Sequence, residues 1–244
     1  MATPFVYKGA KVYSGAYELD AVKSVSVAYA FDEVDITVLG DLCKHGIPGL
    51  CKVNFGLDGF GTMDGTDGTE DVVMAQLAVA NQPLTVCPLT GAAGEAAKFT
   101  TGLGLSYNAG GAVGEAYAFQ SAGIGQKYPV VHGKVFGTGA KTSTGTSSVY
   151  QLGAVGAAQK LYACLHVLAA SGTNPTLDVI VESDDAEAFS SATTRATFTQ
   201  KTEAGSQFVV PIAGPITDTW WRTTWTIGGT DTPTFSIVLA VGIF

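Results

Sequence analysis

The chain has 244 residues, of which 46% are hydrophobic, only 14% are charged and 31 are glycine. This composition argues against a disordered chain and against a helical bundle, and it suits a β-rich protein with many tight turns. The formal net charge of −8 is opposite to that of proteins that grip nucleic acid by its phosphates. The length allows one large β domain or two modest ones.

The N-terminus lacks the basic and apolar regions of a signal peptide, and no run approaches ~18 apolar residues. We therefore expect no secretion signal and no membrane contact. The cysteines form no CxxC motif and have no histidine at ligand spacing. Small buried hydrophobic residues in a reducing cytoplasm are expected, rather than disulfides or a zinc site, for Cys43, Cys51, Cys87 and Cys164.

The first half of the chain predicts strands around one long irregular segment. Residues 22–31 alternate, with Val25, Val27 and Tyr29 on one face and small residues on the other. Residues 32–49 follow with four acidic residues and no clean period, which indicates a functional loop or a hairpin. Further strands are predicted at 51–60, 84–89, 98–107 and 115–120.

Residues 67–83 predict a helix. Asp67 and Glu70 form a capping-box pattern, and Pro83 marks the end of the segment. At helical spacing, an apolar face is formed by Val73, Leu77 and Ala80. This short amphipathic helix is expected to lie on a sheet.

The second half predicts a β-sandwich after a polar tract at 137–148, which is a candidate linker or domain edge. Strands are predicted at 160–168, 176–182, 195–201, 207–212, 217–227 and 234–243. Two domains, 1–140 and 141–244, are therefore expected.

The sequence contains no complete motif for nucleotide binding or for a catalytic serine. The P-loop-like stretch at 137–143 has Ala140 where glycine is required, and no G-x-S-x-G elbow occurs. Of the three histidines, His166 lies mid-strand between apolar residues, which favours a structural role. We expect no catalytic, cofactor-binding or metal-ligating residue, and no cofactor.

Two acidic clusters and three tryptophans have structural interpretations. Asp64 and Asp67 are interpreted as a solvated turn and helix cap rather than a calcium site, and residues 182–187 as a solvated turn. Trp221 and Trp225 share a strand face and are predicted to be core. Trp220, on the opposite face, is a candidate exterior contact, and a sugar platform is the alternative interpretation of these aromatic residues.

The order of these segments resembles the major tail tube proteins of long-tailed, non-contractile bacteriophages. The resemblance covers roughly residues 1–136 and is carried by FDEVDITVLGDLCKHGIPGL and KFTTGLGLSYNAGGAVGEAYAFQSAG. The second half, with YQLGAVGAAQKLYACLHVL and GPITDTWWRTTWTI, looks like an extra exterior β-sandwich that some of these proteins carry.

The resemblance implies a tail-tube-type β-barrel or sandwich with one helix, and self-assembly into stacked hexameric rings. The lumen would hold a tape-measure protein and later conduct DNA without binding it tightly, and a mostly acidic wall is expected. Tail terminator and tail tip proteins would be partners, in a virion tail assembled in the host cytoplasm. Ring stacking is assigned to Asp32, Glu33, Asp35, Asp41, Leu42, His45 and Pro48, and packing of the helix on the outside of the barrel to Val73, Leu77 and Ala80.

Two other function classes stay open. One is a virion decoration or receptor-binding module, in which Trp220 contacts a glycan. The other is an enzyme on a sandwich, for which the sequence names no acid/base pair or nucleophile.

Overall fold

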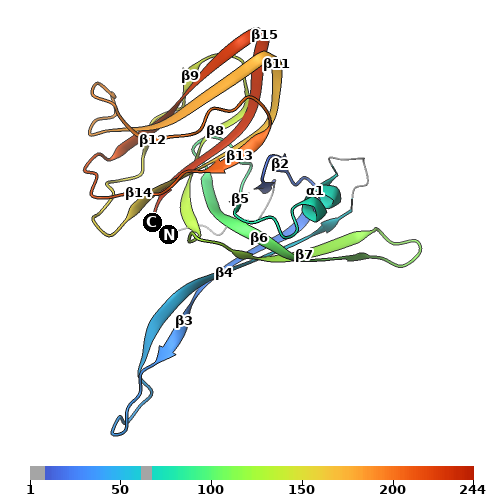
Figure 1. Ribbon diagram of the computed structural model, residues 1–244, viewed down its shortest axis with the longest axis vertical. Coiled ribbons are helices and arrows are strands. Elements are labelled where there is room, and N and C mark those ends of the chain that lie inside the picture. Colours follow the sequence, from blue (N-terminus) through green and yellow to red (C-terminus); the bar gives the residue numbers. More distant parts are fainter. Residues whose placement is uncertain (1–8, 62–67) are drawn as a thin grey trace. The chain divides into compact units, whose positions relative to one another are not determined.

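The computed structural model describes residues 9–61 and 68–244 (Figure 1). These residues are mainly β, with one short helix in the described ranges, which confirms the predicted fold class. They form two compact units. The core unit comprises the described part of Met1–Asp20 together with Gln82–Phe99 and Val131–Phe244, and the arm unit comprises Ala21–Asn81 and Thr100–Val130.

The core unit is built on an antiparallel path of strands in the order β12-β11-β15-β8-β6-β5-β1-β2. β6 (Ala96–Gly110) begins in this unit and ends in the arm unit. The other strands of the core unit are β1 (Lys11–Ser14), β2 (Tyr17–Glu18), β5 (Gln82–Cys87), β8 (Val131–Lys141), β9 (Gly145–Thr146), β10 (Tyr150–Gln151), β11 (Lys160–Asp184), β12 (Thr193–Thr197), β13 (Gly205–Phe208), β14 (Ile212–Ala213) and β15 (Trp220–Ile243).

Two very long strands, β11 and β15, organise this unit. They pair antiparallel from Leu161 opposite Ile243 to Asp184 opposite Trp220. The sequence predicts each of them as two separate strands, but the pairing continues through the predicted breaks, with register shifts between residues 171 and 176. Gly172 and Gly229 have φ of +105° and +115° there, a backbone region that favours glycine. The breaks are bends within continuous strands.

Both halves of β11 and β15 contribute to one buried cluster. Leu165 and Val179 of β11 and Trp221 and Leu239 of β15 are all at most 1% exposed. Trp221 and Trp225 are buried, as predicted, and the Trp221 indole N–H donates to the Gly153 carbonyl at 2.9 Å. Burial of these large side chains, at about 25 cal/mol per Å² of apolar surface, is the main stabilising contribution to the unit.

The polar tract at 137–148 is a strand in its first part. β8 runs on to Lys141, which pairs with Phe235 of β15. The prediction of a linker there was wrong, because a glycine-rich segment acquires strand structure when a long partner strand lies beside it. None of the boundaries between the two compact units falls between residues 140 and 141. The division into domains 1–140 and 141–244 therefore stays a prediction.

The arm unit holds a four-stranded antiparallel sheet in the order β3-β4-β7-β6. Its elements are β3 (Val22–Asp35), β4 (Gly46–Phe60), α1 (Thr69–Ala75), β7 (Ala118–Gly125) and the C-terminal part of β6. The alternating stretches 22–31 and 51–60 do form strands, and residues 32–49 extend both of them as a hairpin. Figure 1 shows this hairpin projecting well past the sheet.

The helix is shorter than predicted. It ends at Ala75 with Gln76 as its C-cap, and Gly68 occupies the N-cap without a side-chain hydrogen bond. The predicted cap Asp67 lies outside the described residues. Ala78 takes a φ of +60° and donates its N–H to the Gly104 carbonyl, so contact with β6 replaces a further helical turn. Val73 is buried, but Leu77 is half-buried and Ala80 is exposed, both beyond the helix end.

Candidate assembly surfaces

The hairpin beyond the Phe31–Cys51 pair, residues 32–50, is called the arm. Its strands are closed by a turn in which Ile36 donates its N–H to the His45 carbonyl at 2.9 Å. The Asp35 carboxylate accepts hydrogen bonds from the Thr37 hydroxyl and the Thr37 N–H, and these bonds lower the pKa of Asp35. All seven residues assigned to ring stacking lie on the arm and are exposed: Asp32, Glu33, Asp35, Asp41, Leu42, His45 and Pro48.

The arm has one apolar and one acidic face. Val34 is directly opposite Ile47 across the hairpin, and Ile36 lies two residues further along, so strand alternation places all three on one face. The intervening residues Glu33 and Asp35 point the other way, and Glu33 pairs with Lys44 at 3.1 Å. A two-stranded hairpin with exposed apolar residues and no core of its own is marginally stable in water.

The tip of the arm carries two leucines, Leu39 and Leu42, that are fully exposed. Exposed apolar side chains gathered in one place on a soluble protein mark an interaction site. The sequence predicts the functional importance of this segment from its length and acidity. Its apolar face becomes visible only once the strand register is known.

β3 is the edge strand of the arm unit. Among the described strands it pairs only with β4, so no described strand pairs with its other edge. A long open edge is a template for pairing with another chain, and native proteins cover or interrupt such edges. On the sheet's opposite side, the edge of β6 is met at Gly104 by a bridge to Leu77.

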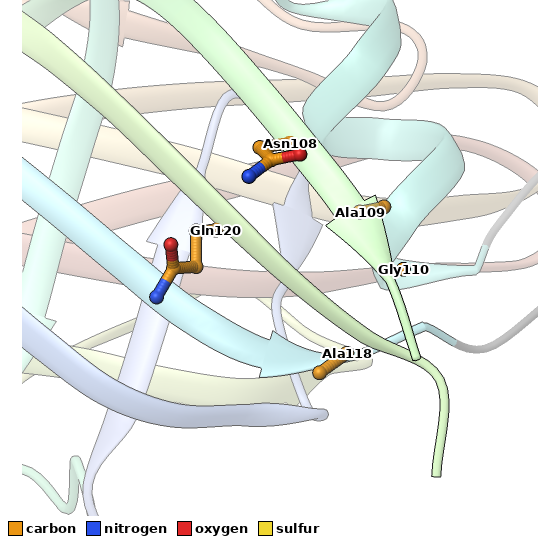
Figure 2. A pocket seen from close by; sticks show the side chains of 5 residues that line it. All are labelled: Asn108, Ala109, Gly110, Ala118 and Gln120. Atoms are coloured by element: carbon orange, nitrogen blue, oxygen red, sulfur yellow. The ribbon is translucent and has the colours of Figure 1, made fainter. Parts of the chain in front are cut away.

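One face of this sheet is exposed, and two neighbouring rows on it carry mostly small or polar side chains. One row across the strands is Ser24, Asp58, Gln120 and Asn108, and the next is Ser26, Gly56, Ala122 and Ser106. In the β3–β4 pairs from Ser24 to Ala30, the charged residues are Asp58 and Lys52. Figure 2 shows Asn108 and Gln120 on neighbouring strands. Both line an open hollow of about 280 Å³.

The opposite face is apolar and partly covered by α1. Val53, Leu57 and Phe119 are buried there, together with Val72 and Val73 of the helix. This division of one sheet into an exposed polar face and a covered apolar face is usual for antiparallel sheets.

Glu70 connects α1 to the hairpin formed by β6 and β7. Its carboxylate oxygen Oε1 accepts hydrogen bonds from the hydroxyls of Tyr107 and Tyr117, the latter at 3.0 Å. Burial, followed by the bond to Glu70, raises the pKa of Tyr107. The other oxygen, Oε2, is buried and has no hydrogen-bond partner among the described residues, and a Cβ built on Gly61 would lie 2.5 Å from it. Close packing at Gly61 therefore holds this carboxylate in place.

The sequence-predicted structural histidine is confirmed. His166 is fully buried in the core unit, and its Nδ1–H donates to the Gly15 carbonyl at 2.7 Å. Nε2 lies 2.8 Å from the Thr85 hydroxyl and 3.3 Å from the Cys164 thiol. Burial lowers the pKa of His166 to about 4, so the ring is neutral.

The cysteines divide into two pairs. Cys87 and Cys164 are buried as predicted, and burial raises the pKa of each thiol to about 12. Cys43 and Cys51 are exposed, so the prediction was wrong for them, because they lie on or beside the arm, which has no interior. No cluster of three potential metal ligands occurs in residues 9–61 and 68–244, and the Asp64–Asp67 stretch lies outside them.

The acidic segment at 182–187 is only partly a solvated turn. Glu182 pairs with Arg222 at 2.8 Å, and the buried Asp184 accepts N–H bonds from Ala186 and Ser191, which lower its pKa. Asp185 and its successors are exposed. Trp220 is half-buried, and its role as an exterior contact stays a prediction. In the described ranges, no helix is long and apolar enough to span a membrane.

No protein-family model and no curated protein sequence matches the chain. Among solved structures, it is similar to the SPP1 Dit protein, described as a paradigm of hub adsorption apparatus in phages that infect Gram-positive bacteria. That match covers 97% of this chain and 100% of that one, at 11% identity and a TM-score of 0.38.

Two further similar structures match about half of this chain. One, from the sheath/tube terminator of an extracellular contractile injection system, covers 54% of this chain and 97% of its own, at 12% identity and a TM-score of 0.43. The other, from the virion of a native gene transfer agent, covers 45% and 83%, at 12% identity and a TM-score of 0.37. Because these identities and TM-scores are low, we infer the function from the surfaces of this chain itself.

Proposed function

We propose that this chain is a structural subunit of a bacteriophage tail tube, which assembles with copies of itself into stacked hexameric rings. The observation that carries the proposal is the open edge of β3 next to an arm that has no core. In one copy no described strand covers this edge of β3, and the arm has no core to pack on. Neighbouring copies of the chain can supply both a partner strand and a packing surface.

Within a ring, the free edge of β3 in one copy pairs with the edge of β6 in the next, so that the four-stranded sheets join into a barrel. Closing a sheet into a barrel removes its exposed edges. The helix α1 then lies outside the wall, and the face with Ser26 and Asn108 lines the lumen. Each copy contributes Asp58 and Lys52 to this face, together with many neutral groups.

A lumen with few cations suits the passage of DNA, because each exposed lysine or arginine attracts phosphate. The expected mostly acidic lumen wall stays a prediction. Residues outside the cross-strand rows of the arm-unit sheet would also contribute to the charge of that wall. The partners in this function are other copies of the chain, a tape-measure protein in the lumen, and the terminator and tip proteins at the tube ends. The assembled protein belongs to the virion tail, and its assembly takes place in the host cytoplasm.

The direct test is negative-stain microscopy of the purified full chain, in which rings or tubes are expected. A variant in which Asn-Gly replaces residues 32–50 joins the Phe31–Cys51 pair by a two-residue turn of the type favoured in hairpins. We expect this variant to keep its β circular-dichroism spectrum and to form no tubes.

The matched control is Val210→Asp, which changes an exposed apolar residue of the core unit. It should leave assembly unchanged, whereas Leu42→Asp at the tip of the arm should abolish tubes. Tubes of normal length from the arm-deleted variant would contradict the assignment of the arm to ring stacking. Monodisperse monomers from the wild-type chain at all concentrations would contradict the proposed function itself.

A further inference from the structure

The arm and the hairpin between β6 and β7 leave the arm-unit sheet at opposite ends. The arm continues from the Asp35–Gly46 pair. The segment 111–117, called the β6–β7 tip, follows the Gly110–Ala118 pair, and Ala118 is opposite Phe60 at the far end of β4. Figure 1 shows the two hairpins extending away from each other.

Both extensions expose apolar side chains. The arm presents Val34, Ile36 and Ile47 on one face, and Val113 in the β6–β7 tip is fully exposed. The tip sequence GAVGEAY contains one charged residue, Glu115, so a mostly neutral tip faces away from the sheet. Tyr117, at the root of the tip, is fixed by its bond to the buried Glu70, which gives the tip a defined direction.

We propose that the apolar face of the arm receives the β6–β7 tip of a second copy of this chain. This inference rests on the proposed function and names the surface that an arm meets. Two apolar patches at opposite ends of one sheet give a head-to-tail contact between copies, which propagates as a filament when the rotation between copies does not close into a ring. The acidic face of the arm, with Glu33 and Asp35, stays in water.

The chain's cysteines provide the test. Cys43 lies in the tip of the arm and is exposed, whereas burial raises the pKa of Cys87 and Cys164 and leaves them without reactive thiolate. In the variant Val113→Cys, the oxidant copper phenanthroline should convert the new thiol and a thiol of a neighbouring copy's arm into an intermolecular disulfide. We expect a ladder of covalent oligomers on a denaturing gel, at least tenfold above the wild-type level.

Two controls identify the contact. Val210→Cys places an exposed thiol in the core unit and should give no ladder. Adding Cys43→Ser and Cys51→Ser to Val113→Cys should remove the ladder, because the exposed thiols on and beside the arm are then gone. As a measurement without cysteine chemistry, Val113→Asp should lower the fraction of protein that sediments as tubes at least tenfold, with an unchanged circular-dichroism spectrum.

The outcomes separate this inference from the proposed function. Wild-type tubes together with no ladder from Val113→Cys, or normal tubes from Val113→Asp, overturn the inference and leave the tube function standing. Wild-type protein that forms no assembly overturns both.

Discussion

The neutral His166 ring should make the core unit sensitive to acid. Its Nδ1–H bond to the Gly15 carbonyl connects β11 to the turn after β1, and the ring is surrounded by Thr85 and Cys164 without access to water. In the unfolded chain the same imidazole titrates near 6.5, whereas in the fold its pKa is about 4. The folded state therefore binds the proton less readily than the unfolded state.

The sign and size of the effect follow from this difference. A group with a depressed folded-state pKa contributes its full stability above pH 6.5 and loses it as the pH falls toward 4. The difference of about 2.5 pKa units, at about 1.4 kcal/mol each, corresponds to about 3.5 kcal/mol of unfolding free energy in full, most of which is lost by pH 4. That amount is a large fraction of the roughly 5–15 kcal/mol that stabilises a typical domain.

The assay is urea unfolding of the wild-type chain and of His166→Asn between pH 7 and pH 4, followed by tryptophan fluorescence. The asparagine amide retains a donor for the Gly15 carbonyl but has no titrating ring. We expect the wild type to lose about 3 kcal/mol more than the variant across this range. Subtracting the two curves removes the contribution of carboxylates such as Asp218, whose pKa its hydrogen bonds to Ser183 and Arg195 lower.

If His166→Asn does not fold, Thr85→Val serves as the second variant. It removes the hydroxyl beside Nε2 and keeps the ring, so it should be less stable by about 1 kcal/mol while keeping the wild-type pH dependence. Parallel pH curves for the wild type and His166→Asn would refute the reasoning, because they would mean that the ring is not held neutral by burial.

Three further predictions concern packing. Gly229→Ala should cost at least about 2 kcal/mol in urea unfolding, because φ is +115° and a Cβ would lie 2.8 Å from the Asn174 carbonyl oxygen; Gly153→Ala, at φ +89° with open space around it, should cost about half as much. Thr223→Val should raise the melting temperature, with a gain of about 1 kcal/mol, since it removes a buried hydroxyl that has no hydrogen-bond partner; a loss of stability would mean that this hydroxyl is satisfied. Glu70→Ala should increase amide hydrogen exchange in the β6–β7 tip by at least tenfold through loss of two tyrosine hydrogen bonds, and unchanged exchange would contradict its anchoring role.

Local signals predicted many of the strands and part of the core. Alternation at 22–31 and 51–60 corresponds to β3 and β4, and the spacing of Trp221 and Trp225 correctly assigned both to the interior. An apolar neighbourhood likewise identified His166 as structural. These features depend on side-chain period and hydrophobicity, which the sequence carries residue by residue.

The sequence failed where a distant partner decides the outcome. Helical spacing predicted Leu77 and Ala80 on the helix, but contact of Leu77 and Ala78 with Gly104 ends it earlier. The glycine-rich residues up to Lys141 read as a linker, yet pairing with β15 about a hundred residues later makes them a strand. Neither partner is visible in a local window.

By itself, then, the sequence determined a β-rich, weakly charged protein, the tryptophan core and the position of an irregular acidic segment at 32–49. The tertiary structure decided which edge of which strand is open and which face of the arm is apolar. The physical reason is that edges and faces are properties of register, and a shift of one residue exchanges the two faces of a strand. Only the cross-strand pairs, such as Val34 with Ile47, fix that register.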